Sequence, residues 1–89
     1  MDAIVFQHSK GAHTRRKIIQ ALYKQERENF LHCAATLCGD FEISNAAIKK
    51  HIDYLSLEGY VEKINPEGKP IFLKLSEKGN VAAKKYILL

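Results

Sequence analysis

Apolar residues recur at helical spacing in several segments of the chain, most clearly in residues 45–58. Three of them, spaced four and three residues apart, line one side of the helix that this spacing predicts: Ile48, Ile52 and Leu55. Ser44 is a good capping residue for the N-terminus of that helix, and Gly59 suits the position just past its last turn. The segment is therefore predicted to form an amphipathic helix with both of its ends marked.

Three other segments have helical patterns. Residues 14–25 carry one apolar stripe, which consists of Ile18, Ile19, Leu22 and Tyr23. Residues 31–38 are predicted to form a second helix, which Gly39 stops. Its inward-facing residues are Ala34, Leu37 and Cys38. Residues 77–87 are predicted to form the last helix, with Ser76 as its cap.

Two β-prone runs stand on either side of a turn in the second half of the chain. Residues 60–64 and 71–75 are rich in β-branched and aromatic residues. Between them, Pro66 presets the backbone at the second position of a turn, and Gly68 supplies a permissive fourth position. The pattern predicts a β-hairpin over residues 60–75.

Short segments join the predicted elements. Residues 26–29 form a polar connection, Phe30 is expected in a very short strand, and residues 39–44 form the turn before the 45–58 helix. The element order predicts a single α+β domain over residues 1–89. It comprises an N-terminal arm (1–13), a core (14–80) and a C-terminal helix (76–89).

Charge is distributed unevenly along a basic chain. The net charge is +4 and the isoelectric point is about 9.1. Residues 1–28 carry six Lys and Arg against three acids, and residues 65–89 carry five against two, whereas residues 44–64 carry three of each. This distribution suits a polyanionic partner, and it equally fits a solvated surface with an excess of lysine.

Several classes of function find no support in the sequence. A glycine-rich phosphate loop and a G-x-S-x-G motif are absent, and no carboxylate pair can be assigned to a pocket, so an enzyme is not expected. The spacing of Cys33 and Cys38 matches no metal motif, so no metal or other cofactor is expected. No leader and no run as long as a membrane span is found in the sequence.

The two cysteines are predicted to be small core residues in a reducing, cytoplasmic setting. Cys33 and Cys38 lie five positions apart on a predicted helix, which points them in different directions and disfavours an intrachain disulfide. An intermolecular disulfide is an open alternative.

Three passages of the chain carry a resemblance to a known family. Residues 14–23 resemble a first helix, residues 43–61 a recognition helix with its closing glycine, and residues 75–79 the L-[ST]-x-x-G sequence that follows a wing. In this order they resemble the DNA-binding core of the MarR-like small transcriptional regulators. The resemblance covers residues 14–85 and implies a winged helix-turn-helix: a three-helix core, a two-stranded β-hairpin wing and a C-terminal helix.

The chain also departs from that family. The turn at residues 39–44 is longer than the usual one, and the wing tip at residues 66–69 lacks the arginine that many MarR-like wings carry. The extra terminal helices that dimerise MarR proteins and build their ligand pocket have no counterpart in the sequence. DNA binding is therefore implied by the resemblance, and no small-molecule ligand is predicted.

The resemblance implies which residues of the 45–58 helix would read DNA. In the major groove, four of them would face base edges: Asn45, Ala46, Lys49 and Lys50. Asn45 could pair with adenine, Lys49 with guanine, and Ala46 could meet a thymine methyl group. The alternatives are ordinary helix-start chemistry for Asn45 and a solvated helix side for the two lysines.

A second set of residues is expected to contact DNA phosphates: Arg15, Arg16, Lys17, Ser44, His51, Tyr54, Lys63 and Lys69. Residues 15–17 would place three cations in the first turn of a helix, where the helix dipole disfavours them unless a phosphate docks nearby. Two members have structural alternatives. His51 could hydrogen-bond within a helix interface, and Tyr54 could pack against the wing.

The chain ends on an apolar run that is unusual for a free surface helix: Tyr86, Ile87, Leu88 and Leu89. These residues are expected to form a contact between two copies of the chain, with folding back onto the same copy as the alternative. Two-fold symmetry in a homodimer would predict a palindromic DNA site.

Together these inferences predict a sequence-specific DNA-binding transcriptional regulator that represses by steric occlusion. Its partners would be double-stranded DNA and a second copy of the chain. The 45–58 helix would enter the major groove, and the 60–75 wing would rest on the DNA backbone. The alternative is a winged-helix module for protein–protein contact, which the neutral charge of residues 44–64 supports.

Overall fold

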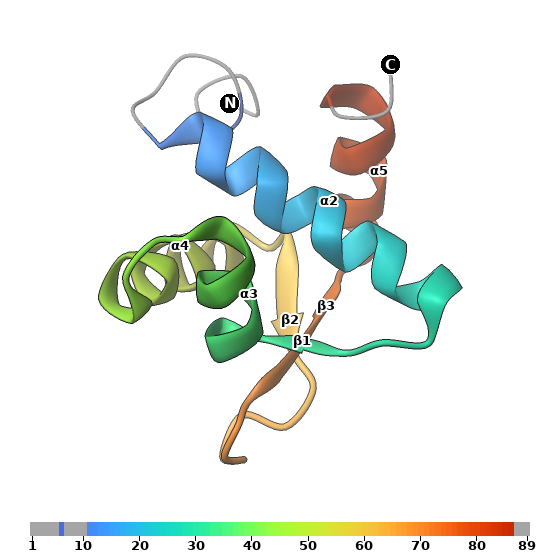
Figure 1. The fold of residues 1–89 in the computed structure, drawn as a ribbon. Helices are drawn as coiled ribbons and strands as arrows, with labels where there is room; N and C mark the ends of the chain where they lie inside the picture. Colours follow the sequence, from blue (N-terminus) through green and yellow to red (C-terminus); the bar gives the residue numbers. More distant parts are fainter. Residues whose placement is uncertain (1–5, 7–10, 87–89) are drawn as a thin grey trace.

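The protein is an α+β domain of helices packed around a small antiparallel sheet (Figure 1). The computed structural model describes residue 6 and residues 11–86, apart from the side chains of residues 26 and 86. In chain order the elements are α2 (Ala12–Glu28), β1 (His32–Cys33), α3 (Ala34–Phe41), α4 (Asn45–Leu57), β2 (Val61–Lys63), β3 (Phe72–Leu75) and α5 (Glu77–Tyr86). This confirms the predicted α+β class and winged-helix order.

The sheet has three strands in the order β1-β3-β2. In the predicted hairpin, Val61 pairs with Leu75 and Lys63 with Leu73. The short first strand lies at His32–Cys33 and not at Phe30, which is 49% exposed. A residue of α2 holds this strand in place, because the backbone N–H of His32 donates to the side-chain oxygen of Gln25.

Helix α2 is longer than the predicted 14–25 segment. It follows Gly11, whose φ of 91° lies in the left-handed region, and it ends at Asn29, whose φ is 51°. The polar residues expected to form a connection after residue 25 continue the helix up to residue 28 instead. Glu, Arg and Gln are good helix formers, so a polar run does not by itself end a helix.

Helix α3 lies three residues later than the predicted 31–38 segment. Its start is fixed at Cys33, whose backbone N–H donates to the Thr36 hydroxyl at 3.0 Å. Gly39 does not stop it, and the helix continues to Phe41, where Glu42 adopts a φ of 55°. The turn before α4 is therefore residues 42–44, and the expectation of an unusually long turn is wrong.

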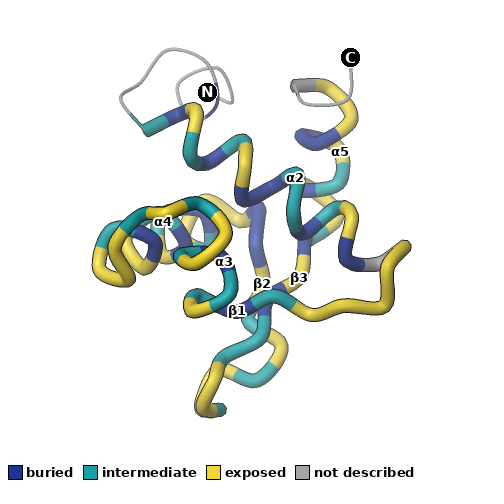
Figure 2. The backbone as a smooth tube through the Cα atoms, viewed as in Figure 1, coloured by how far each residue is buried: buried dark blue, intermediate teal, exposed yellow. Residues whose placement is uncertain are grey.

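The core lies where α2 crosses the sheet, between α4 on one side and α5 on the other (Figures 1 and 2). Its largest fully buried members are Phe6, Ile18, Ile19, Leu22, Leu37, Ile48, Leu55, Tyr60, Val61 and Leu73. Phe6 belongs to the segment predicted to be an N-terminal arm, residues 1–13. Its ring packs edge-on against Tyr60, with the ring centroids 4.9 Å apart.

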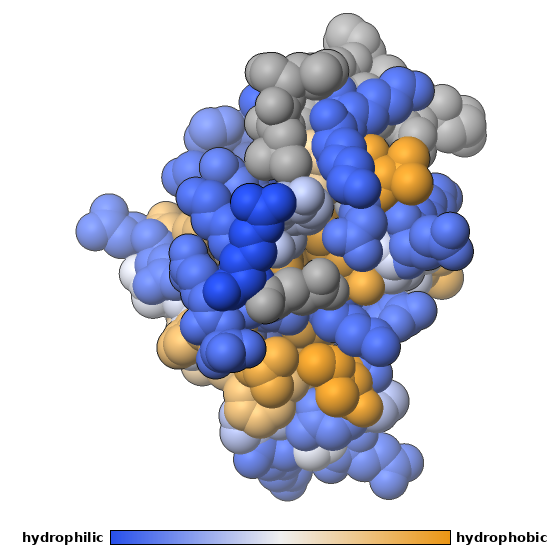
Figure 3. All heavy atoms as spheres, turned by 90° about the vertical axis from the view of Figure 1, so that its right-hand side faces the viewer, coloured by the Kyte–Doolittle hydropathy of each residue, from blue (hydrophilic) through white to orange (hydrophobic). Residues whose placement is uncertain are grey.

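Some large apolar side chains of the described residues are exposed: Phe30, Leu31, Leu57, Ile64 and Val81. On the face shown in Figure 3, hydrophilic side chains divide the apolar surface into separate areas. Scattered exposure of this kind is normal for a folded domain and does not by itself mark an interface.

Candidate nucleic-acid interface

Helix α4 is held so that one side is buried and the other projects into solvent. The Ser44 hydroxyl accepts the backbone N–H of Ala47 at 3.1 Å, and Gly59 has a φ of 86° just after the helix. The predicted apolar stripe is buried: Ile48, Ile52 and Leu55. Both predicted helix ends and the buried side of the 45–58 segment are thereby confirmed to within a residue.

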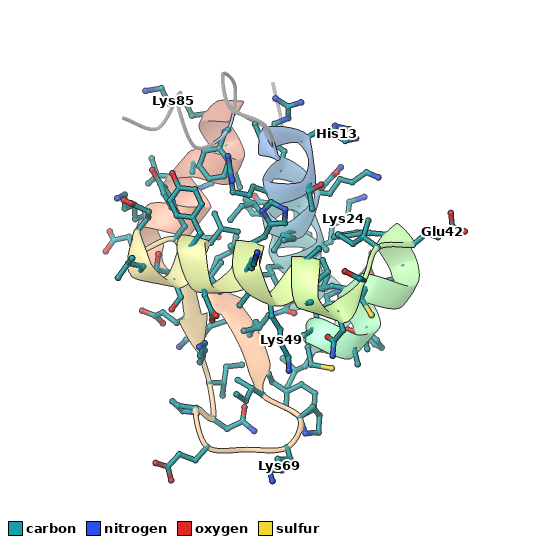
Figure 4. All side chains as sticks on the ribbon, turned by 90° about the vertical axis from the view of Figure 1, so that its left-hand side faces the viewer. His13, Lys24, Glu42, Lys49, Lys69 and Lys85 are labelled. Carbon is teal, nitrogen blue, oxygen red and sulfur yellow. The ribbon has the colours of Figure 1, made fainter. Side chains whose placement is uncertain are left out.

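The four predicted base-contacting residues share one exposed surface of α4. Asn45, Ala46, Lys49 and Lys50 are all exposed, whereas the apolar stripe is on the other side of the helix. Figure 4 shows Lys49 extending from α4 toward the hairpin loop, with Lys69 at the tip of that loop. The fold therefore brings the two predicted lysine sites, helix and wing, to the same end of the molecule.

A groove of about 660 Å³ separates α4 from the hairpin loop. Its apolar lining includes Ile52, Ile71 and Leu73. Its charged and amide-bearing lining residues are Asn45, Lys49, Asp53, Lys63, Glu67 and Lys69. Three lysines against two acids leave the groove with a small net positive charge, which is compatible with a polyanionic partner.

Asp53 is a site residue that the sequence reasoning missed. The Lys63 ammonium donates to its carboxylate at 3.2 Å, across the space between β2 and α4. Lys63, expected to contact phosphate, is thus already paired within the protein. The helical spacing from Lys49 to Asp53 could have placed Asp53 on the exposed side of α4. Its partner, Lys63, lies ten residues further along the chain, and no local sequence pattern indicates that pairing.

The three cations near the start of α2 have different environments. Because the helix begins at Ala12, Arg15 closes its first turn and Arg16 and Lys17 lie in the second, so the helix dipole acts on them less than the predicted start at residue 14 implied. The Arg16 guanidinium donates to the backbone carbonyl of Phe6 at 2.6 Å. Lys17 is exposed, with its ammonium 5.6 Å from the ring centroid of Phe41.

Arg15 is the member of this trio that departs most from expectation. Only 5% of the residue is exposed, and its guanidinium lies over the ring of Tyr54 at 4.7 Å from the centroid. In this conformation Arg15 is not open to a phosphate. Tyr54 packs toward α2 through this contact, and not against the wing.

His51 lies on the same side of α4 as Tyr54, against the start of α2. A Cβ built on Gly11 would be 2.7 Å from Cε1 of His51, so the two helices approach closely here. Burial, and after it the Arg15 guanidinium, lower the pKa of His51 below its ordinary value of 6.5. This position favours the helix-interface interpretation of His51 over a phosphate contact.

Three solved structures have the same fold. Lactococcus lactis ZitR in complex with DNA has a TM-score of 0.74 and 20% identity, and the match covers 92% of this chain and 54% of that one. Escherichia coli MarR in its apo form has a TM-score of 0.70 and 19% identity, with coverage of 86% and 56%. A mutant of the same MarR in complex with operator DNA has a TM-score of 0.69 and 19% identity, with coverage of 86% and 54%.

The fold is a MarR-like winged helix. No family model and no curated protein sequence matches the chain. The chain spans about half the length of the solved structures that it matches. In winged-helix terms, α2, α3 and α4 are the three-helix core and the β2–β3 hairpin is the wing.

The winged helix offers no obvious metal centre in the part that the structure describes. Within residues 6 and 11–86, no three His, Cys, Asp or Glu side chains are grouped so that they could hold a metal ion. Cys33 is buried, Cys38 is partly buried, and both are free thiols. None of the described helices is long and apolar enough to cross a membrane.

The apolar end of the winged helix mostly lies outside the described residues. Tyr86 is the last residue of α5, its side chain is not described, and residues 87–89 lie beyond the described part. The dimer contact expected of Tyr86, Ile87, Leu88 and Leu89 therefore stays a prediction.

We expect the winged helix to lose stability as the pH falls below neutral. Burial lowers the pKa of His51 and also that of His32, where Asp40 and Glu28 partly oppose the shift. Below the unfolded value of 6.5 the unfolded chain then binds more protons than the folded one, so the free energy of unfolding decreases until the pH has passed the folded-state pKa. Urea denaturation between about pH 5.5 and 7.5 measures the slope.

The His51→Gln variant serves as the matched comparison for this pH dependence. It should unfold with a shallower pH dependence than the wild type over the same interval, because the contribution of His51 is removed. A wild-type stability that is constant, or that rises as the pH falls, would contradict the assignment.

Proposed function

We propose that this protein is a sequence-specific DNA-binding transcriptional regulator that represses by occluding its site. Helix α4 would enter the major groove and the β2–β3 wing would rest on the DNA backbone. The observation that carries the proposal is the exposed N-terminal part of α4, where Asn45, Lys49 and Lys50 project from a helix anchored by its other side. Structures with this fold include two bound to DNA, which supports the proposal.

The roles of the individual residues follow from their placement. Asn45 would pair with adenine, Lys49 and Lys50 with guanine acceptors, and Ala46 would contact a thymine methyl group. Ser44, at the exposed start of α4, and Lys69, at the wing tip, would contact phosphates on either side of the groove. Lys63 would join them only after exchanging its bond to Asp53 for a phosphate.

The contacts on α2 are proposed for two residues. Lys17 is exposed and can reach a phosphate without rearrangement. Arg16 would have to share its guanidinium between a phosphate and the carbonyl of Phe6, which its several N–H donors permit. Both contacts would brace the start of the core on the DNA backbone.

Fluorescence anisotropy with a labelled random-sequence duplex, repeated over a salt series, tests the proposal. We expect binding with a dissociation constant of about 10⁻⁶–10⁻⁴ M or tighter. The logarithm of the binding constant should fall linearly with the logarithm of the salt concentration, with a slope of about 0.9 for each neutralised phosphate. Selection from a random-duplex library then identifies the preferred site. A chain that fails to bind duplex DNA at low salt does not have this function.

We further propose that the regulator acts in the cytoplasm as a homodimer joined through the apolar end, residues 86–89. Two-fold symmetry would then match half-sites one helical turn apart. Light scattering over a concentration series measures the mass, and a strict monomer at high concentration contradicts the dimer.

A second function, contact with another protein, is favoured by the acid on the α4 surface. Asp53 has a side chain that is 68% exposed, and it neutralises part of the charge around the groove. A protein partner with mixed charges could bind such a surface. This second function would be favoured if the chain binds no DNA and if the NMR amide signals of α4 shift when a purified protein partner is added.

A further inference from the structure

We propose that Arg15 sets the orientation of α4 from inside the molecule and is a positioning residue for DNA binding. The inference rests on the proposed DNA-binding function. Arg15 belongs to α2, Tyr54 belongs to α4, and the guanidinium of one covers the ring of the other at 4.7 Å. A cation that is 5% exposed gains from this contact because little water competes for it.

The Arg15–Tyr54 contact is one of two that hold α4 along the same side. One turn earlier on α4, His51 packs against Gly11, where a Cβ would be 2.7 Å from the ring. The absence of a Cβ at Gly11 permits this close approach, and glycine also adopts the φ of 91° found there without strain. Helix α4 is thus fixed to α2 at two successive turns, which limits both its tilt and its rotation.

These two turns lie opposite the wing side of α4. The buried stripe sets how deep the helix lies, and the planar guanidinium stacked on Tyr54 adds a contact that depends on the rotation of α4. A small rotation of α4 would move Lys49 and Lys50 away from the bases that they are proposed to contact. Arg15 would therefore affect affinity without touching the DNA.

Salt dependence separates this role from a direct phosphate contact. For Arg15→Ala we expect affinity for a duplex selected by the wild type to fall about tenfold, while affinity for the random-sequence duplex and the salt slope change little. A phosphate contact would instead lower the slope by about 0.9. Lys17→Ala is the matched control, because it removes an exposed cation from the same helix and should lower the slope.

Tyr54 variants test the same contact from the other helix. Tyr54→Phe keeps the ring and should bind as the wild type does, whereas Tyr54→Leu should weaken binding as Arg15→Ala does. The double variant Arg15→Ala/Tyr54→Leu should lose much less than the sum of the two single losses, because both substitutions disrupt the same Arg15–Tyr54 contact. Additive losses, or a reduced salt slope for Arg15→Ala, would overturn the proposal.

Folding and the proposed function are tested separately. Circular dichroism confirms that each variant is folded at the temperature of the binding assay, and if Arg15→Ala is not, Arg15→Lys and the Tyr54 pair decide the question. If the wild type binds no duplex DNA, the proposed function fails. The amide shifts of α4 in Arg15→Ala then still test the positioning, since an α4 with wild-type shifts would overturn it.

Discussion

We expect the double variant Lys49→Ala/Lys50→Ala to bind its selected duplex about a hundredfold more weakly than the wild type, a loss of about 2.8 kcal/mol. The two lysines lie on the exposed surface of α4, and they are two of the four residues proposed to contact base edges there. A specific contact to a base contributes about 1–3 kcal/mol of discrimination, so two of them account for a loss of this size. Fluorescence anisotropy at a fixed salt concentration measures it.

The matched control for this variant is Lys84→Ala/Lys85→Ala. It removes the same charge from α5, and Figure 4 shows Lys85 at the end of the molecule away from Lys49 and Lys69. We expect this control to lose less than about threefold, because exposed charges beyond a Debye length are largely screened at physiological salt. Equal losses in the two variants would mean that α4 does not carry the recognition.

We expect Gly79→Ala to lower the free energy of unfolding by about 2–3 kcal/mol. Gly79 is buried at the start of α5, and a Cβ there would collide with the backbone carbonyl oxygen of Tyr60. The backbone of Tyr60 cannot rotate away from the added methyl group as a side chain could, so α5 must move away from the sheet. The same carbonyl accepts the N–H of Ser76 at 3.0 Å, and this bond would be disturbed as well. Urea denaturation measures the change.

Gly39→Ala is the control for the Gly79 variant. Gly39 lies within α3, and a Cβ built there has nothing within 4 Å. Alanine is the better helix former by about 1 kcal/mol, so this variant should be as stable as the wild type or more stable. A Gly79→Ala protein as stable as Gly39→Ala would contradict the close packing of α5 on the sheet.

The two glycines also show what the sequence can and cannot predict. Gly79 is part of the passage that resembles the family, and its close approach to Tyr60 explains why a glycine suits that position. The sequence predicts that Gly39 stops a helix, but glycine does so only when the backbone turns left-handed there. The turn occurs instead at Glu42, a residue with no strong local preference for it.

Helix α4 and the wing are predictable because their information is local. The spacing of Ile48, Ile52 and Leu55, the cap at Ser44 and the glycine at residue 59 all lie within one short segment. The hairpin is marked by its own turn residues. These elements carry the proposed interface, so the surface with Lys49 and Lys50 is predicted together with the fold.

The surroundings of α4 are not predictable because they depend on contacts between distant segments. Arg15 stands in a basic run, and such a run indicates exposure to solvent or contact with a phosphate. Nothing in the local sequence shows that Tyr54 covers Arg15. The same holds for Phe6, which occupies the core from a segment without a clear pattern, and for the pairing of Asp53 with Lys63. In each case the partner comes from a different element of the fold.

The central claim is that α4 and the wing form one DNA-binding surface, and amide mapping by NMR tests it most directly. Unlabelled duplex DNA is titrated into the ¹⁵N-labelled chain at low salt. We predict that the largest shifts fall in residues 44–50 and in the loop at residues 65–70, with small shifts over α5. Shifts that are absent, or that concentrate away from α4 and the wing, would contradict the account.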